Sequence, residues 1–484
     1  MAEKIFTNTN DLVAFLGKEP EQFTKADVRD FIVKNKIEFV NFMYFAADHK
    51  LKTLNFVITN EEYLNSILTF GERVDGSSLF PYIEASSSDL YVLPRFCTAF
   101  VDPFAIRPTL CMLCSFFDRN GNLLETSSEY TMQKADRSFT EQTGMTFEAM
   151  VELEYYVIGQ AETSDAFIVP NQKGYHESSP YTRFNEFRKE CMAHIARVGG
   201  TIKYGHNEVG NFTYEGKIYE QNEIEFLPAR VQKTADSMLI AQWIIRNLAY
   251  QRGLDITFAP KISTGKAGSG MHVHTRIVKE GKNQYISEEK LSDIARKTIA
   301  GFITLAPSLT AFGNMRPSSY MRLVPHQEAP TNVCWGDSNR SVLIRVPLGW
   351  TTKTDMSAKI NPLEQQLNIN AEYKQTIEIR SPDATADIYL LLAGLAVAAA
   401  YGIQMPDGLD IAEKSYVDVN IHSEEHKEEV RYLKHLPTSC RESATKLNEQ
   451  RNIYQANDVF CPKLIEDIIH LLENYKEEKM NFGL

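Results

Sequence analysis

The pattern of apolar and polar positions changes near residue 128. Residues 26–128 contain short elements: a helical segment (ADVRDFIVKN), strand-like runs such as IEFVNFMYF and TLCMLCSFF, and the hairpin signal Asn120-Gly121. Residues 129–484 instead alternate longer helices with longer strands. Residues 1–25 are polar and mixed, and we expect an N-terminal extension there. The pattern predicts a small β-rich domain followed by a larger one. A chain of 484 residues is also longer than a single hydrophobic core usually organises.

The larger part has the periodicity of an α+β fold. Its strand-like segments VELEYYVIG and MHVHTRIV carry polar side chains at every second position between apolar ones. This alternation predicts a mainly antiparallel sheet with flanking helices and with the polar pairs on its inner face. We expect strands over 201–228 and helices over 181–199, 234–252, 288–312 and 386–403.

Three short stretches place two reactive side chains two residues apart. In a β-strand, residues i and i+2 point to the same face, so each stretch aims both groups into one space. Carboxylates held that close in a cleft require a cation, a proton or an Arg nearby. Several carboxylates beside a His suit a hard divalent ion such as Mg²⁺ or Mn²⁺. The pairs are Glu152 and Glu154, His272 and His274, and Glu378 and Arg380.

Two further acids extend this candidate site. Glu208 (GHNEVG) and Glu223 (QNEIEF) lie on adjacent strand-like segments. Two acids on one strand are commonly its solvated face, and a lone His on a strand is commonly structural. The apolar residues on both sides of the acids in VELEYYVIG favour a buried site instead. Several acids beside a His also suit two ions that bridge the phosphates of ATP.

Glycines and arginines surround the same motifs. Gly268-Ser269-Gly270 precedes the His pair, and glycines there let the backbone approach a ligand. Because Ala267 follows Gly265-Lys266, the phosphate-loop motif GxxxxGK[ST] is not matched there, and any ATP would be held by metals and Arg. Arg forks match carboxylate and phosphate geometry. The arginines among apolar neighbours are Arg322, Arg340 and Arg345.

Composition restricts the kinds of binding partner and compartment that we expect. The net charge of −12 disfavours a nucleic-acid partner, although local arginines can still hold an anionic substrate. The odd count of seven cysteines suits a reducing compartment, and Cys111 and Cys114 are expected to be buried and structural. The N-terminus has no signal-peptide core, and the apolar run over 389–403 is too short to span a bilayer. We therefore expect a cytoplasmic protein without a membrane segment.

At family level, the motifs resemble glutamine synthetase of the bacterial type. The resemblance runs in order from near residue 26 to the end of the chain. It implies an N-terminal β-grasp domain over 26–128 and a catalytic domain with a curved sheet over 129–484. It also implies a homo-oligomer of two stacked hexameric rings, with active sites between subunits. The matching motifs are VDGSS, VELEYY, HNEV, QNEIEF, PKISTGKAGSGMHVH, SYMRLVPHQEAP, NRSVLIRVP and IEIRSPDATADIYL.

The resemblance also implies a reaction and a role for each motif residue. The family transfers the γ-phosphoryl group of ATP to the side-chain carboxylate of glutamate, and ammonia then displaces it to give glutamine. One Mg²⁺ or Mn²⁺ would be held by Glu154, Glu208 and Glu223, and another by Glu152, His272 and Glu378. His274, Arg340 and Arg345 would lie on the nucleotide side.

The remaining residues would act on glutamate and ammonium. Arg322 would bind the α-carboxylate of glutamate, with backbone contact from Gly268. Arg340 and Arg380 would bind substrate and stabilise the transferring group. Asp75 of the adjacent subunit would take the ammonium proton, and Glu328 would cover the intermediate.

Three functions remain open from the sequence. The leading one is an ATP-dependent glutamate–ammonia ligase, favoured by the complete ligand set and by Asp75 and Glu328. A γ-glutamyl-amine ligase is the alternative, because Ala267 stands where the family usually has Asn and the Trp335 segment also differs. Asp75 favours the small ammonium cation over a larger amine. A non-catalytic relative is a third possibility, against which the retained ligands argue.

Overall fold

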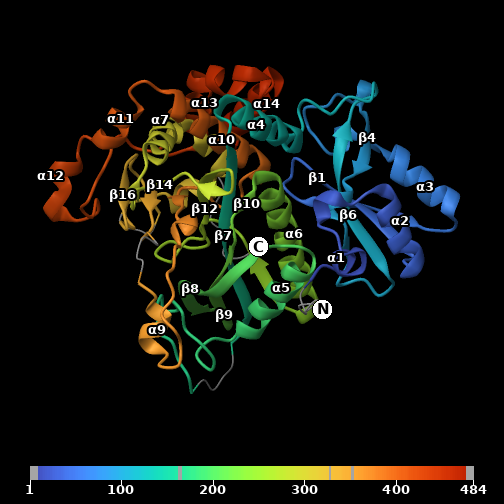
Figure 1. Ribbon diagram of the computed structural model, residues 1–484, viewed down its shortest axis with the longest axis horizontal. Helices are drawn as coiled ribbons and strands as arrows, with labels where there is room; N and C mark the ends of the chain where they lie inside the picture. The colour runs from blue at the N-terminus through green and yellow to red at the C-terminus, as the bar shows by residue number, and fades with distance from the viewer. Residues whose placement is uncertain (1–8, 162–165, 326–328, 350–353, 476–484) are drawn as a thin grey trace.

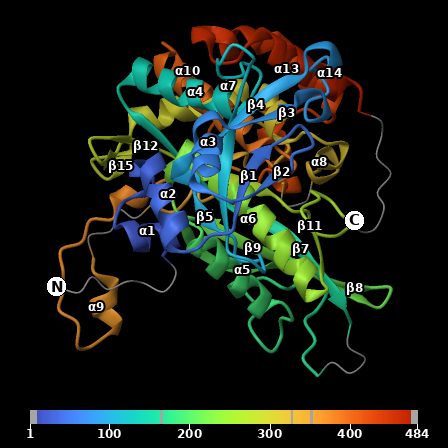
Figure 2. The same cartoon turned by 90° about the vertical axis from the view of Figure 1, so that its right-hand side faces the viewer.

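A computed structural model describes residues 9–161, 166–325, 329–349 and 354–475. A small domain lies beside a larger one, and each contains a sheet with helices (Figure 1). Figure 2 views the molecule from the side of the small domain, with α13 (Cys440–Gln455) and α14 (Pro462–Glu473) at the top. The predicted α+β class is confirmed.

The small domain is built on a six-stranded sheet. Its order is β2-β1-β6-β4-β3, with β5 also paired to β6. Only the β1–β6 pair of this sheet is parallel. Leu110 and Met112 of β6 pack with Val28 and Leu64 from the helices in one apolar core. The elements are β1 (Phe39–Phe45), β2 (Leu51–Val57), β3 (Glu72–Asp75), β4 (Asp89–Pro94), β5 (Phe100–Val101), β6 (Thr109–Phe117), α2 (Lys25–Lys34) and α3 (Glu61–Phe70).

The described part of the predicted N-terminal extension packs against both domains. It contains α1 (Asp11–Leu16), whose Leu12 is fully buried in the core of the small domain. The Asn10 side chain caps this helix by accepting from Leu12 N at 2.8 Å. Its amide donates to Ala99 O at 3.2 Å and to Val198 O at 3.4 Å. We retain the division at residues 25 and 128 as a proposal.

The larger domain is built on a ten-stranded sheet. Its main path is β16-β17-β18-β12-β7-β9-β8, with β10 and β11 on β7 and β13 on β12. Only β16 and β17 pair in parallel, so the sheet is mainly antiparallel as predicted. The strands are β7 (Thr146–Gln160), β8 (Ile202–Tyr214), β9 (Lys217–Phe226), β10 (Ala229–Arg230), β11 (Asp255–Thr257), β12 (Met271–Lys279), β13 (Lys282–Asn283), β16 (Trp335–Asp337), β17 (Ile344–Val346) and β18 (Ile377–Ile379).

Helices cover one face of this sheet in two layers. Two helices, α4 and α6, contact β7, and α10 packs on both of them and on α7. No single helix within the described ranges is long and apolar enough to cross a membrane; α10 and α11 pass that test only together, with a 108° bend between them. The helices are α4 (Ser128–Thr143), α5 (Asn185–Arg197), α6 (Val231–Arg252), α7 (Asp293–Gly313), α8 (Pro317–Arg322), α9 (Met356–Ile360), α10 (Ile388–Gln404), α11 (Gly408–Lys414) and α12 (Lys427–Val430).

Some predicted boundaries are wrong. The hairpin expected at Asn120-Gly121 closes with only one bridge, Phe117 to Leu123, because the chain then turns into α4. The helix expected from residue 288 begins at Asp293, since Ser292 caps it by accepting from Ala295 N and the preceding residues form the small hairpin of β14 (Ile286–Ser287) and β15 (Lys290–Leu291). As predicted, Cys111 and Cys114 are buried and free.

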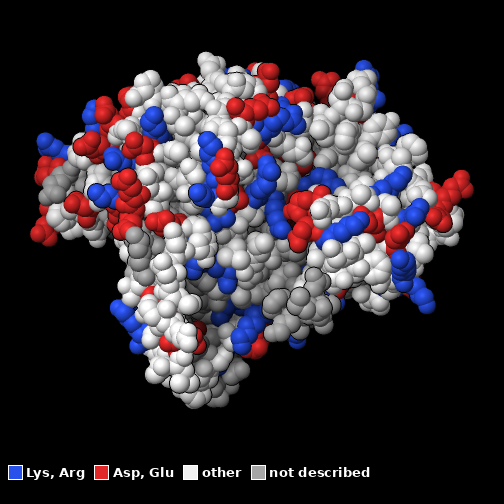
Figure 3. All heavy atoms as spheres, in the orientation of Figure 1, with Lys and Arg blue, Asp and Glu red and all other residues white. Residues whose placement is uncertain are grey.

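The surface carries both signs of charge. On the face in Figure 3, Lys and Arg side chains of the described residues are interspersed with Asp and Glu rather than gathered in one broad basic area. Nucleic-acid binding rests on such a basic footprint. This face therefore gives no support to a nucleic-acid partner.

Candidate active site

The acids of β7 lie on the face of the sheet opposite the helices. Val151, Leu153 and Tyr155 pack in the main apolar core. Strand alternation turns Glu152 and Glu154 to the other face. The neighbouring strands repeat this arrangement, because His272 of β12 is paired with Glu152, and Glu223 of β9 with Glu154. The i, i+2 pattern of the sequence thus becomes one polar layer across several strands.

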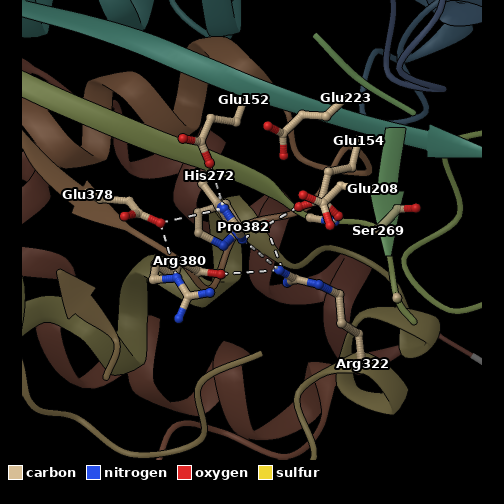
Figure 4. Close-up of polar contacts among 12 residues, drawn as sticks. Glu152, Glu154, Glu208, Glu223, Ser269, His272, Arg322, Glu378, Arg380 and Pro382 are labelled. Atoms are coloured by element: carbon tan, nitrogen blue, oxygen red, sulfur yellow. Dashed lines mark hydrogen bonds and ion pairs between the residues drawn. The ribbon is translucent and has the colours of Figure 1, made fainter. Parts of the chain in front are cut away.

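Three side chains form the first group of possible metal ligands. The Nδ1 atom of His272 lies 2.9 Å from Glu152 Oε2 and 3.6 Å from Glu378 Oε1. Figure 4 shows the carboxylates of Glu152 and Glu378 beside the His272 ring, with Arg380 next to Glu378 and Arg322 across the ring from it. Glu378 is held by Arg345 Nη1 at 2.9 Å and by Arg380 Nε at 3.0 Å. Ligand atoms of Glu152, His272 and Glu378 are close enough to share one ion.

The second group lies one strand further along the sheet. His206 Nε2 is 3.1 Å from Glu223 Oε1, and His206 Nδ1 is 4.0 Å from Glu208 Oε1. Together, ligand atoms of these three residues could hold one ion. Glu154 lies between the two groups, with its Oε1 at 3.8 Å from His272 Nε2. Its Oε2 accepts from Gly270 N at 2.8 Å and from Gln221 Nε2 at 3.0 Å, which orients the carboxylate.

Burial of so many carboxylates perturbs their protonation. Burial, with the carboxylates of Glu152, Glu154 and Glu208, raises the pKa of Glu223 well above its ordinary value. Burial by itself would raise the pKa of Glu152 too, but His274 and His272 hold it well below its usual range. A divalent ion would relieve this repulsion, and carboxylate oxygens with one imidazole are donors that Mg²⁺ and Mn²⁺ accept. The residues present therefore fit a pair of such ions.

Arginines and glycines complete the inner face. Arg322 of α8 donates to the backbone oxygens of Ser381 at 2.8 Å and Arg380 at 3.2 Å, and its Nη2 lies 3.4 Å from His272 Nε2. A Cβ at Gly270 would collide with Arg322 and lie 2.9 Å from His272 Nε2, so glycine is required there. A Cβ at Gly268 would likewise come too close to the Pro260 carbonyl oxygen and to the stem of the Arg322 side chain. The glycines thus admit protein side chains as well as any ligand.

The nucleotide-side candidates have defined partners. His274 Nε2 lies 2.8 Å from Glu152 Oε1 and its Nδ1 lies 2.9 Å from Thr376 Oγ1. The Arg340 guanidinium lies over the Tyr175 ring at 5.7 Å, and its carbonyl accepts from Arg380.

Two further residues next to these motifs, Arg276 and Ala267, also have defined partners. The Arg276 side chain, next on the same face of β12, is neutralised by Glu148 Oε2 at 2.6 Å from Nε. Ala267 O accepts from Tyr156 at 2.9 Å, and Ala267 N donates to Gln172 Oε1 at 2.6 Å. The loop is therefore held by its backbone.

Two predicted residues do not join this cluster in the described chain. Asp75 ends β3 at the edge of the small sheet, is exposed, and accepts from Ser77 and Ser78 at 2.7 Å each. Hydrogen bonds from Ser78, Ser77 and Ser88 lower the pKa of its carboxyl. Glu328 lies outside the described residues.

Sequence reasoning missed three side chains of this layer. Glu225 is buried beside Glu152, and burial with that neighbouring carboxylate raises the pKa of Glu225 to about 7. It belongs to a third group of possible ligands with Glu152 and His274. The signal was present, because QNEIEF places Glu223 and Glu225 two apart and GHNEVG does the same for His206 and Glu208. Gln221, two residues before Glu223, carries the same spacing.

Comparisons with known proteins agree over both domains. The model of the glutamine synthetase β-grasp domain matches residues 36–119, and that of the glutamine synthetase catalytic domain matches residues 130–481. The glutamine synthetase of Aquifex aeolicus is 28% identical over 473 residues, covering 92% of this chain and 94% of the relative. That of Mycolicibacterium smegmatis is 29% identical over 492 residues, covering 94% and 95%.

Solved structures share the fold. A cryo-EM structure of Plasmodium falciparum glutamine synthetase superposes with a TM-score of 0.76 at 19% identity, covering 93% of this chain and 95% of that one. A structure titled apo GmaS without ligand has a TM-score of 0.70 at 18% identity, covering 92% and 94%. The expected β-grasp domain is thereby confirmed.

Proposed function

The chain belongs to the glutamine synthetase family, and on that premise we propose that it is an ATP-dependent ligase that forms glutamine from glutamate and ammonia through a γ-glutamyl phosphate. The observation that carries this proposal is the polar layer of the large sheet, where carboxylates and imidazoles from five strands converge. Burying so many ionisable side chains together costs free energy of folding, and proteins accept that cost mainly at functional sites.

The ligand sets follow from this layer. One ion would be held by Glu154, Glu208 and Glu223, with His206 beside Glu223. The other ion would be held by Glu152, His272 and Glu378. When bound, two divalent ions would supply positive charge that stabilises the transferring phosphoryl group. Burial and the Glu152 carboxylate would raise the pKa of Glu378, but His274, Arg380 and His272 hold it below its ordinary value. Arg345 and Arg380 also form ion pairs with this carboxylate.

The arginines would bind the anionic ends of both substrates. Arg322 would take the α-carboxylate of glutamate near Gly268, and Arg380 the side-chain carboxylate that accepts the phosphoryl group. Arg340 and Arg345, with His274, would contact the phosphates of ATP. These charged donors are positioned before the reaction by backbone carbonyls and by Glu378, which is how preorganised groups stabilise a transition state.

Asp75 supports a site shared between subunits. The carboxylate is ionised and exposed, and its hydrogen-bond partners are turn residues rather than the polar layer of its own chain. In a homo-oligomer, such as the two stacked hexameric rings implied by the resemblance, it would enter a neighbour's site and accept a proton from ammonium. The amine needs a free lone pair to attack the acyl phosphate. Glu328 would cover that intermediate.

One assay tests the reaction. The purified protein with ATP, Mg²⁺ and glutamate is expected to release phosphate and glutamine only when ammonium is added. Glu378→Ala removes a proposed ligand and is expected to abolish both products, whereas Glu62→Gln on the exposed face of α3 is the matched control with full activity. Phosphate release that ignores every amine would contradict the proposal.

A γ-glutamyl-amine ligase is the second candidate, favoured by aromatic rings beside the second ligand group. His176 stacks on Tyr175 at 4.1 Å and lies 4.2 Å from the His206 ring. Tyr175 and Tyr204 are 43% and 45% exposed, enough to contact a ligand. Aromatic faces attract organic ammonium ions. A panel of alkylamines and polyamines in the same assay decides between them: preference for an organic amine over ammonium would replace the leading proposal.

A further inference from the structure

One positive side chain of the polar layer has no assigned role. Lys203 follows Ile202 at the start of β8, where Ile202 pairs with Phe226 and Tyr204 pairs with Glu225. Lys203 is therefore the extra residue of a β-bulge. Bulges re-aim side chains and occur often beside active sites. Here the bulge brings the Lys203 ammonium within 2.6 Å of Glu225 Oε2, at the inner face of the sheet.

Lys203 lies at the end of a row of charges that crosses six strands. Arg345 of β17 pairs with Glu378 at 2.9 Å, and His274 of β12 contacts Glu152 of β7 at 2.8 Å. Glu225 of β9 is paired in register with Glu152 and ion-paired with Lys203. The row thus begins with a guanidinium and ends with an ammonium. An anionic chain lying along it would meet a fixed cation at either end.

The ammonium group of Lys203 retains donors for such a ligand. An ammonium has three N–H donors. Among the described residues, the Lys203 ammonium is ion-paired with Glu225 and lies over the face of the Tyr204 ring, with Nζ at 5.0 Å from the ring centroid. Its side chain is 37% exposed while that of its partner Glu225 is 4% exposed, so part of the lysine is open to solvent beside a buried carboxylate. Glu225 would hold the lysine in place, and the exposed side would contact the ligand.

We propose that Lys203, anchored by Glu225, is a phosphate-binding residue of the nucleotide site. The assignment rests on the proposed function, in which His274, a member of the same three-residue group as Glu225, lies on the nucleotide side. Lysine binds phosphate as a compact point charge, and the strength of that contact follows charge-assisted hydrogen bonding. The ligand is the phosphate chain of a nucleoside di- or triphosphate rather than its base or ribose.

Direct binding separates this role from a structural one. Calorimetry at saturating Mn²⁺ would give the dissociation constants of ADP and of adenosine for wild type and Lys203→Met. We expect the ADP constant to rise about tenfold or more, as for one lost charge-assisted hydrogen bond, and the adenosine constant to stay unchanged. The matched control is Lys217→Met on β9, a lysine of similar exposure whose ion pair with Asp255 at 3.0 Å lies outside the polar layer, and it is expected to change neither constant.

Two further variants sharpen the outcome. Lys203→Arg keeps the charge and is expected to retain most of the ADP affinity. If Lys203 only neutralised Glu225, then Glu225→Gln in the Lys203→Met background would restore ADP binding, and that result would overturn the assignment. Equal ADP constants for wild type and Lys203→Met would overturn it too, as would a parallel loss of adenosine. Wild-type protein that binds no nucleotide at all would instead refute the proposed function, and the assignment with it.

Discussion

Two buried strands, β6 in the small sheet and β7 in the large one, differ in the side chains that they bury. On β6, every residue from Thr109 to Phe116 is buried, and Leu110 and Met112 pack in an apolar core. On β7, one face is equally apolar, but the other carries Glu152 and Glu154. Burial alone therefore does not indicate stabilisation. The small sheet gains free energy from its buried side chains, whereas the polar face of the large sheet costs free energy until cations occupy it.

The largest expected effect comes from removing one charge of the polar layer. Glu223→Gln keeps the side-chain shape, and we expect Mn²⁺ affinity to fall by more than the roughly 10–100-fold typical of losing an outer partner. Ligase activity should be lost with it. The metal-free variant should nevertheless melt at a higher temperature than wild type, since the raised pKa of Glu223 shows that its ionised form is disfavoured in the fold.

Calorimetric Mn²⁺ titration and thermal melts in a chelator check both halves of this prediction. Glu62→Gln, an exposed acid on α3, is the control and should change neither quantity. A metal-free Glu223→Gln protein that is less stable than wild type would break the contrast between the sheets, because the carboxylate would then stabilise the fold without a cation.

The second prediction concerns Asp75 of the small domain and Glu378 of the large domain, which would act together across a subunit interface. Asp75→Asn keeps the turn but removes the proposed base, and activity should fall about 10²–10⁴-fold, the usual contribution of acid–base catalysis. Glu378→Ala should be inactive for a different reason. Co-expressed in equal amounts, the two variants should recover about a quarter of wild-type activity, because a heterologous interface pairs an intact Glu378 with an intact neighbouring Asp75 that often by chance. No recovery would show that Asp75 acts otherwise.

The sequence predicted the elements better than it predicted their ends. The helix α6 was predicted over 234–252; its end before the left-handed Gly253 is confirmed, but it begins three residues earlier, at Val231. The hairpin after β6 was overestimated, since a good turn signal cannot show that the returning segment joins a helix instead of a strand. The packing of Leu12 in the small domain was hidden, because one apolar residue in a polar segment has no period.

The site was predictable where its side chains repeat at strand spacing. The pairs containing Glu152, His272 and Glu378 were found in that way, and the structure brings them together. Glu225 carries the same spacing and was overlooked. Lys203 could not have been found, because its place depends on a β-bulge that only the register with β9 reveals. The roles of all these residues stay predictions until the assays above are made.

A third prediction concerns the ionic network that joins the small sheet to the large domain. Arg95, after β4, donates to Asp236 of α6 at 2.7 and 2.8 Å, and Tyr389 of α10 donates to the same carboxylate at 2.6 Å. Arg95→Met leaves Asp236 and Glu129 buried without their cation, and should cost about 3–5 kcal/mol of stability. Adding Asp236→Asn should recover part of that loss in thermal melts. Equal stability of Arg95→Met and wild type would mean that this ionic network does not stabilise the contact between the two domains.

The smallest effect is expected inside the small sheet, where shape matters more than charge. Met112 is fully buried on β6, so Met112→Leu nearly conserves volume and should cost less than about 1.5 kcal/mol, while Met112→Ala opens a cavity and should cost about 2–5 kcal/mol. Neither change should alter Mn²⁺ affinity, because the small-sheet core contains none of the proposed ligands. Thermal melts with and without Mn²⁺ measure both quantities. If the ion stabilised Met112→Ala less than wild type, the two sheets would be energetically coupled, and the separation between a stabilising and a functional sheet would fail.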